Sequence, residues 1–365
     1  MGKSNDAIVQ MQEADENSQQ IQVGTVVVNQ GITEKRAREV FTEMIPQVLE
    51  DYAQEAYATA NSRIEKLEDI VVPRILETDN AISSLSDPVI QLMLKRAQQT
   101  AAATEREDDY SLLSELIVCQ IQKGADRKNR TGIKKAIEIV GDVDVDALCA
   151  LTVAHAISVY LPVSGNVREG ISTLNNLFSR LFQGSLPNGV DWLDHLDVLG
   201  ALRLSKIMTL RKLKDIYTDS LNGYACTGIR IDSEEYKKSM ELLVSTGLGA
   251  SVLQENELLE GYVRIPVANK EGICKLSLVT PKEVRPITEK EITVLETIWD
   301  MYDLENTLRE KVKDSFMKLW DSYDALKCVH VWWDDIPFSF EITKVGTVLA
   351  HTNAKRCDSG LPDLL

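Results

Sequence analysis

The sequence predicts a mainly α-helical protein: a helical central domain, preceded by a β-prone N-terminal leader and followed by a small winged-helix-like α+β unit. Three observations support this fold class. Of the 365 residues, 44% are hydrophobic and 26% are charged, as in ordinary globular chains. Between residues 87 and 246, apolar residues recur mostly every three or four positions, and several segments end at a glycine. After residue 247, short alternating segments typical of strands appear between the helical ones.

These patterns divide the chain into five segments. They are the leader (1–31), a long helix (32–77), a helical domain (87–246), a winged-helix-like α+β domain (247–356) and a tail (357–365). No repeat with a period of 20–50 residues is visible, which argues against a solenoid.

The leader is rich in Asn and Gln and contains two β-prone pieces, residues 8–12 and 21–28. Valine-rich segments favour extended structure, but two short strands do not stabilise themselves in water. We therefore expect the leader to pair with the same segment of other copies and form a homo-oligomer. A hairpin packed on the chain's own body and a disordered tail are the alternatives. The oligomerisation residues would be Ile21, Val23, Val26 and Val28.

A long helix follows the leader, and Thr33 can cap its first turn. It is either one helix or two helices joined at Pro46. Its apolar positions form a narrow stripe, which suits either pairing with another helix or packing against the chain's own core. The stripe consists of Val40, Met44, Val48, Tyr52, Ala56, Ile64, Leu67 and Val71.

The central helices have clear start and stop signals. Asp87 caps a helix that has Pro88 at its first position. The uncharged stretch 147–167 is too short in its apolar part to cross a bilayer, so we expect a buried core helix. The other expected helices are 109–123, 131–140, 167–182, 190–201 and 233–243.

The C-terminal third mixes both periodicities. Residues 261–267, 328–333 and 338–342 read as strands, and 286–302, 305–325 and 345–353 as helices, with Thr288 and Thr343 as caps. If 328–333 is a strand, Trp332 and Trp333 face opposite sides. One of them would then be buried and the other more exposed.

Charge and cysteine usage restrict the class of protein. With 56 acidic and 40 basic residues the net charge is −16, which argues against general binding to nucleic acid or to an anionic membrane. No two of the six cysteines form a CxxC pair, so a zinc finger is excluded. Since the N-terminus lacks a signal peptide, we expect reduced thiols, a cytoplasmic location and no membrane partner.

No motif identifies a reaction, a cofactor or a metal. Asp142, Asp144 and Asp146 resemble the start of a calcium loop, but the required Gly and Glu are missing, so a helix cap is the better interpretation. Asp191 and His195 are four residues apart and lack further ligands, which favours an ordinary surface helix. We therefore expect no catalytic residue, although an enzyme with an unrecognised site stays an alternative.

Two basic clusters stand out in this acidic chain. The first contains Arg127, Lys128, Arg130, Lys134 and Lys135. The second contains Arg203, Lys206, Arg211, Lys212 and Lys214. Either cluster could bind phosphate, RNA or an acidic partner, or could be a solvated face that balances nearby acids.

Two resemblances to known families are visible. Residues 109–166, with DRKNRTGIKKAIEIV and LTVAHAISVYLPVSG, resemble a bacterial family without an assigned activity, whose members carry a Gln/Asn-rich VVVNQGI-type leader. The segment from Phe340 to Ala350 is similar to the end of Abi-alpha-type proteins, which are associated with abortive infection. These resemblances imply a bacterial protein that acts in antiphage defence by assembly or binding.

The predicted function is therefore a non-enzymatic, self-assembling interaction protein, with a protein or phage-derived molecule as a further partner. A nucleic-acid-sensing regulator that uses the winged-helix-like end is the alternative from another class, although nucleic acid is not the favoured partner.

Overall fold

The structure is a computed structural model that describes residues 34–78, 85, 87–123, 127–182, 184–279 and 284–363, without the side chains of residues 34–52 and 123–129. The chain forms two compact units, Met1–Ala58 and Thr59–Leu365, and helix α1 runs through both. The predicted oligomerisation residues Ile21, Val23, Val26 and Val28 lie outside the described residues, so that expectation stays a prediction.

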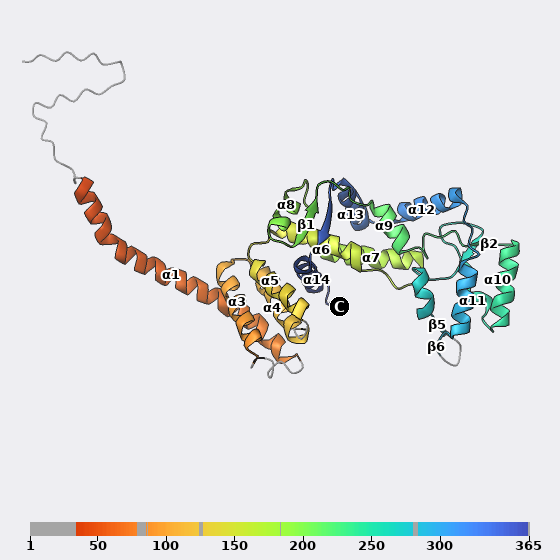
Figure 1. Ribbon diagram of the computed structural model, residues 1–365, viewed down its shortest axis with the longest axis horizontal. Helices are drawn as coiled ribbons and strands as arrows, with labels where there is room; N and C mark the ends of the chain where they lie inside the picture. Colours follow the sequence, from red (N-terminus) through yellow and green to blue (C-terminus); the bar gives the residue numbers. More distant parts are fainter. Residues whose placement is uncertain are drawn as a thin grey trace, which may run out of the picture. The chain divides into compact units, whose positions relative to one another are not determined.

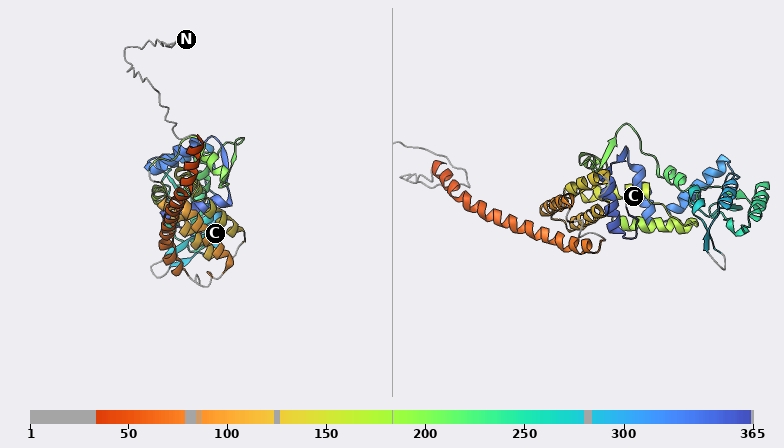
Figure 2. Two further views of the ribbon diagram at one scale, coloured as in Figure 1. Left: turned by 90° about the vertical axis from the view of Figure 1, so that its left-hand side faces the viewer. Right: turned by 60° about the horizontal axis from the view of Figure 1, so that its bottom comes forward.

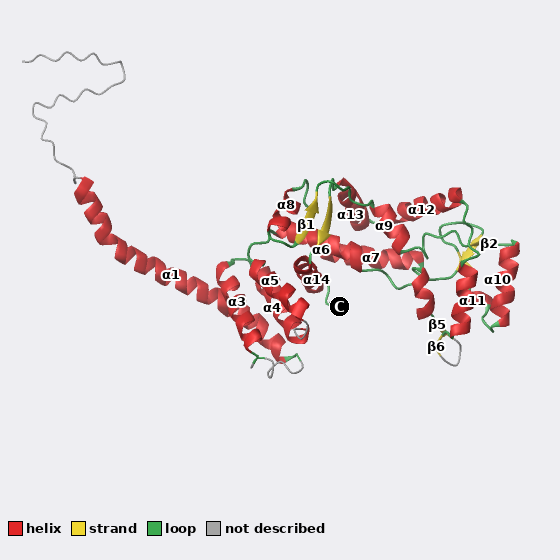
Figure 3. Ribbon diagram, viewed as in Figure 1, coloured by secondary structure: helices red, strands yellow, loops and turns green. Residues whose placement is uncertain are grey.

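Helices dominate the described residues, and the strands are few and short, which confirms the mainly α-helical prediction (Figure 3). The α-helices are α1 (Glu34–Leu76), α3 (Pro88–Ala103), α4 (Glu107–Lys123), α5 (Arg127–Ile139), α6 (Val145–Val159), α7 (Val167–Leu181), α8 (Asp191–Val198), α9 (Leu213–Ser220), α10 (Glu234–Ser245), α11 (Glu289–Trp299), α12 (Asn306–Trp320), α13 (Asp324–Asp335) and α14 (Lys344–Cys357). Two 3₁₀ helices, η1 (Ala250–Val252) and η2 (Lys270–Lys275), accompany them.

The strands form small antiparallel sheets. Strand β1 (Leu202–Ser205) pairs with β7 (Ser339–Ile342), with Leu202 opposite Ile342. The second sheet has the order β2-β4-β3. Its strands are β2 (Ile229–Arg230), β4 (Tyr262–Arg264) and β3 (Gln254–Glu255). A hairpin joins β5 (Ser277–Val279) to β6 (Val284–Pro286).

Helix α1 is continuous from Glu34 to Leu76, so the alternative of two helices joined at Pro46 is wrong. In the second unit, Leu67, Val71 and Ile75 are buried, which shows that this end of the predicted stripe packs on the chain's own core. Arg63 donates to the Ala102 carbonyl at 3.1 Å, where α3 ends. The structure does not describe the side chains at the other end of the stripe, which are those of Val40, Met44, Val48 and Tyr52.

A first hydrophobic core takes residues from the helices α3 to α9 and α12 to α14, and α3, α4, α5, α6 and α14 make many of its contacts. Figure 1 shows α3, α4 and α5 side by side, and the right-hand view of Figure 2 shows the same group beside the blue C-terminal helix α14. Alanines and Gly346 let α14 approach its neighbours closely, since a Cβ at Gly346 would overlap the Ala201 carbonyl. As predicted, α6 is a core helix, with every side chain from Ala150 to Ile157 buried.

A second, smaller core lies in residues 229–302 and joins α10, α11 and the β2-β4-β3 sheet. The first core takes residues from both sides of this stretch, mainly Leu67–Tyr224 and Phe316–Ala354. The boundary between the two cores therefore does not coincide with residue 247, where the predicted α+β domain begins. The division into 87–246 and 247–356 and the winged-helix-like arrangement are not confirmed and stay predictions.

Arg264 connects the two cores. Its guanidinium is fully buried, donates to the carbonyl of Gly165 at 2.7 Å and of Gly223 at 3.2 Å, and lies 3.5 Å from the Glu257 carboxylate. Glu257 in turn accepts from the backbone amides of Val167 and Arg168, at the N-terminus of α7. One buried cation thus holds the start of α7 against the β4 strand of the second core.

The strand predicted at 328–333 is wrong, because these residues lie within α13. The run of Val and Trp resembles a strand, but α13 buries Leu326, Val329, Trp332 and Trp333 in the first core, and this packing outweighs intrinsic propensity. Trp332 and Trp333 are both buried, at 8% and 5% exposure, so the expected contrast between a buried and an exposed tryptophan is also wrong.

The predicted helix caps at Asp87, Thr343 and Thr288 are confirmed, whereas Thr33 lies outside the described residues. Asp87 accepts from the Val89 amide, Thr343 from Gly346, and Thr288 from Glu291. Glu291 closes a capping box at Thr288 and also binds Arg285, and these contacts lower the pKa of its carboxyl to about 2. Local side chain–backbone bonds of this kind depend on neighbouring residues alone.

Candidate functional site

The first predicted basic cluster lies on α5, which begins at Arg127. The side chains of Arg127 and Lys128 are not described, so their part in the cluster stays a prediction. Lys135 is exposed and lies 3.9 Å from Glu138. Arg130 and Lys134 point to another side of α5, where they line a groove against α3. The structure thus brings two of the five predicted residues to one place.

The α3–α5 groove has a volume of about 460 Å³ and is lined by Val89, Leu92, Met93, Arg96, Arg130, Thr131 and Lys134. Its cations are Arg96 on α3 and Arg130 and Lys134 on α5, and no carboxylate lines it among the described residues. Arg96 binds Glu138. Met93 is buried beneath, whereas Leu92 is 50% exposed. The groove therefore combines positive charge with an apolar strip.

Sequence reasoning missed the contribution of α3 to this groove. Arg96 is separated from Arg130 by 34 residues, and only the packing of α3 on α5 brings them together. The start signals at Asp87 and Pro88 predict α3 but do not indicate which helix lies beside it.

Four of the five residues of the second basic cluster bind partners within the fold, and Arg203 lies exposed on β1 opposite Glu341. Lys206 lies 3.1 Å from Asp194, and Lys214 lies 2.7 Å from Asp314. Arg211 binds Asp219, and Lys212 donates to the backbone carbonyl of Asp334. The hydrogen bond to Asp314 raises the pKa of Lys214, and the same hydrogen bond lowers the pKa of Asp314. These cations contact residues of α8, α9, α12 and α13. This arrangement agrees with the alternative that the cluster is a face that balances nearby acids.

The acidic motifs are structural. Asp144 caps α6 by accepting from the amides of Asp146 and Ala147. The amide of Asp144 donates to Nε2 of His195 at 3.1 Å, so His195 on α8 serves as an acceptor there. Within the described part of the chain, no group of three or more His, Cys, Asp and Glu side chains could hold a metal ion.

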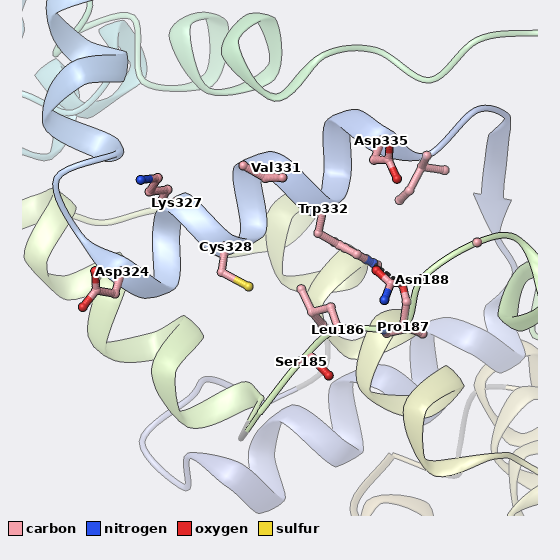
Figure 4. A pocket seen from close by; sticks show the side chains of 12 residues that line it. Ser185, Leu186, Pro187, Asn188, Asp324, Lys327, Cys328, Val331, Trp332 and Asp335 are labelled. Atoms are coloured by element: carbon pink, nitrogen blue, oxygen red, sulfur yellow. Dashed lines mark hydrogen bonds between the residues drawn. The ribbon is translucent and has the colours of Figure 1, made fainter.

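An apolar pocket of about 460 Å³ lies between α13 and the loop 185–189. Figure 4 shows Trp332, Cys328 and Leu186 around the same space, with Asp324 and Lys327 at its edge. The Trp332 indole donates to the Pro187 carbonyl at 3.0 Å and thereby holds the loop on the helix. The lining is largely apolar, and the charged groups lie on the exposed rim, so the pocket lacks converging polar groups that would indicate a reaction.

Burial lowers the reactivity of two of the thiols. The expected reduced state of the cysteines stays a prediction. Burial raises the pKa of Cys149 to about 11 and that of Cys226 to about 12, so both stay protonated at neutral pH.

Comparison with known families adds one finding. A family model described as ":-like" matches residues 31–362. The chain belongs to this family. The match includes α1, the α3–α5 groove and the pocket on α13. No curated protein and no solved structure matches the chain. Among the described residues, no helix combines the length and apolar composition needed to cross a membrane.

Proposed function

We propose that this chain is a non-enzymatic, self-assembling interaction protein of a bacterium that acts in antiphage defence of the abortive-infection type. One observation supports assembly most directly. Every side chain from Ala53 to Thr59 of α1 is exposed, which is nearly two full turns, and Tyr57 is 69% exposed. A helix stabilised by packing normally buries one face. A second copy of the chain is the partner that would cover this part of α1.

The leader adds a second assembly element directly before α1. Its valines offer apolar area that a lone strand cannot bury, and each buried valine contributes about 1.5–3 kcal/mol. Strand pairing through Ile21, Val23, Val26 and Val28 would hold copies together, and α1 would extend the contact.

The mass in solution tests the assembly. We expect the full chain to exceed 40.8 kDa by light scattering at micromolar concentration. The double variant Val26→Pro, Val28→Lys removes a ladder donor and adds charge, so its mass should fall. The control Ser18→Pro, Gln20→Lys makes the same kinds of change outside the valine segment and should keep the wild-type mass. A monomeric wild type would contradict the proposal.

The defence role rests on the Abi-alpha resemblance and is tested in cells. Bacteria that produce the chain should give fewer plaques with a panel of phages than bacteria with an empty vector. The Val26→Pro, Val28→Lys variant, produced at the same level, should lose this protection. Equal plaque numbers across the panel would contradict the defence role and leave the assembly test unaffected.

A further inference from the structure

The α3–α5 groove carries unbalanced positive charge in an acidic protein. The net charge of the chain is −16, yet three cations and no carboxylate among the described residues line this groove. Glu138 binds Arg96. For Arg130 and Lys134, the described side chains provide no carboxylate within ion-pair distance. A ligand that fits must therefore supply negative charge.

The apolar strip restricts the ligand further. Leu92 is half exposed next to the cations, and Val89 and Met93 continue the strip along α3. A bare phosphate would satisfy the cations but leave Leu92 in water. An acidic amphipathic helix would satisfy both, because it presents carboxylates beside apolar side chains.

The chain itself contains a helical segment in which carboxylates and apolar residues lie side by side in the sequence. Between Arg38 and Arg63, the sequence of α1 has five acids, Glu39, Glu43, Glu50, Asp51 and Glu55, and no Lys or Arg. Residues 39–62 are called the acidic stretch below. Its apolar residues recur at helical spacing, with Val48, Tyr52 and Ala56 four positions apart. The side chains from Ala53 to Thr59, including those of Glu55 and Tyr57, are exposed.

We propose that the acidic stretch of α1 in one copy docks in the α3–α5 groove of a second copy. This inference rests on the proposed self-assembly and names its contact surfaces. Glu or Asp side chains of the stretch pair with Arg130 and Lys134, and its apolar residues cover Leu92. Each copy offers both surfaces, so two copies exchange helices in a closed dimer or many copies form an open chain.

Charge reversal tests the pairing in the full chain. The variant Arg130→Glu, Lys134→Glu should associate about tenfold more weakly than wild type, because attractions become repulsions. The control Lys238→Glu, Lys290→Glu changes the net charge by the same amount on exposed residues of α10 and α11 and should keep the wild-type mass. If the wild type is oligomeric and the Arg130→Glu, Lys134→Glu variant has the same mass, the inference is wrong. The self-assembly proposal would stand in that case.

Exchanging the charges of the two surfaces tests whether the acidic stretch is the partner of the groove. The variant Glu50→Lys, Asp51→Lys should also lose mass when alone. Mixing it with the Arg130→Glu, Lys134→Glu variant restores opposite charges at both kinds of contact, so the mixture should recover the wild-type mass. Failure to recover on mixing would overturn docking between copies, because an intramolecular contact cannot be rescued by a second chain.

Nucleic acid is tested with a fluorescent single-stranded DNA of 20 nucleotides, chosen as a probe of phosphate binding. We expect no binding that depends on Arg130 and Lys134 at 150 mM salt. If the probe binds with a salt-dependent affinity that the groove variant loses, while the mass of that variant is unchanged, the groove is a phosphate site and the inference is overturned. A monomeric wild type would contradict the self-assembly proposal itself.

Discussion

The hydroxyl of Tyr160 lies 2.9 Å from Nδ1 of His351, in the buried contact between α6 and α14. His155 stands next to both, with its ring centroid 5.8 Å from that of His351. Nε2 of His155 is buried and has no hydrogen-bond partner among the described residues. Burial, with a smaller contribution from His351, lowers the pKa of His155 to about 4. The two helices therefore meet around an imidazole that must stay neutral.

This histidine predicts a pH dependence of stability. A depressed histidine pKa means that the unfolded chain takes up a proton first, near pH 6.5, whereas the folded chain resists until about pH 4. Its contribution to stability is thus fully present above pH 6.5 and falls as the pH drops towards 4. Between pH 7.5 and pH 5, the free energy of unfolding of the wild type should fall by about 2 kcal/mol more than that of His155→Gln. Urea unfolding at both pH values measures this difference. Parallel curves for wild type and His155→Gln would contradict the buried neutral imidazole.

Arg264 predicts a large loss of stability when its charge is removed. Replacement by Met leaves the Glu257 carboxylate and several backbone carbonyls without their donor, which costs about 3–5 kcal/mol in the free energy of unfolding. Arg264→Lys keeps the charge but has fewer donors, so its loss should be intermediate. The exposed Arg230, on the neighbouring strand β2, is the matched control, and Arg230→Met should change little. Equal effects at the two positions would show that the buried arginine is not the connection.

Two glycines in helices predict losses of different size for the same substitution. Gly346→Ala places a methyl group against the backbone carbonyl of Ala201, which cannot move aside, and should cost about 1–3 kcal/mol. At Gly132 the new methyl group lies 3.1 Å from Cγ and 3.4 Å from the carbonyl oxygen of Lys344, so its neighbours need to shift only slightly. Gly132→Ala should therefore cost less than Gly346→Ala, because the gain in helix propensity offsets part of the strain. Thermal unfolding of both variants measures the difference, and a stabilised Gly346→Ala would refute the close approach of α14.

The N-cap of α6 predicts a moderate loss of stability when its side chain is removed. Asp144→Ala removes the acceptor for the amides of Asp146 and Ala147, which should cost about 1 kcal/mol. Asp142→Ala changes an exposed neighbour that caps nothing in α6 and serves as the control. Urea unfolding at neutral pH distinguishes the two, and an equal response would contradict the cap assignment.

The sequence predicts the helix caps correctly, but it does not indicate which helices pack together. Asp87, Asp144 and Thr288 were predicted as caps because a cap depends on residues two or three positions away. The strand predicted through Trp332 and Trp333 failed because the composition of α13 favours a strand while its packing favours a helix. The α3–α5 groove was half predicted: Arg130 and Lys134 are visible in the sequence, but the pairing with Arg96 depends on which helices meet.

The return of the C-terminal segment to the first core has a consequence for synthesis on the ribosome. Strand β7 pairs with β1, and α14 packs on α5 and α6, so residues near 350 complete a core that begins near residue 67. Translation at about 5–20 residues per second separates the end of α6 from the end of α14 by roughly 10–40 s. During that interval the alanine-rich face of α6 lacks the cover that α14 provides in the folded chain. A chain that is cut before α14 would therefore leave the first core open on the side that α14 covers.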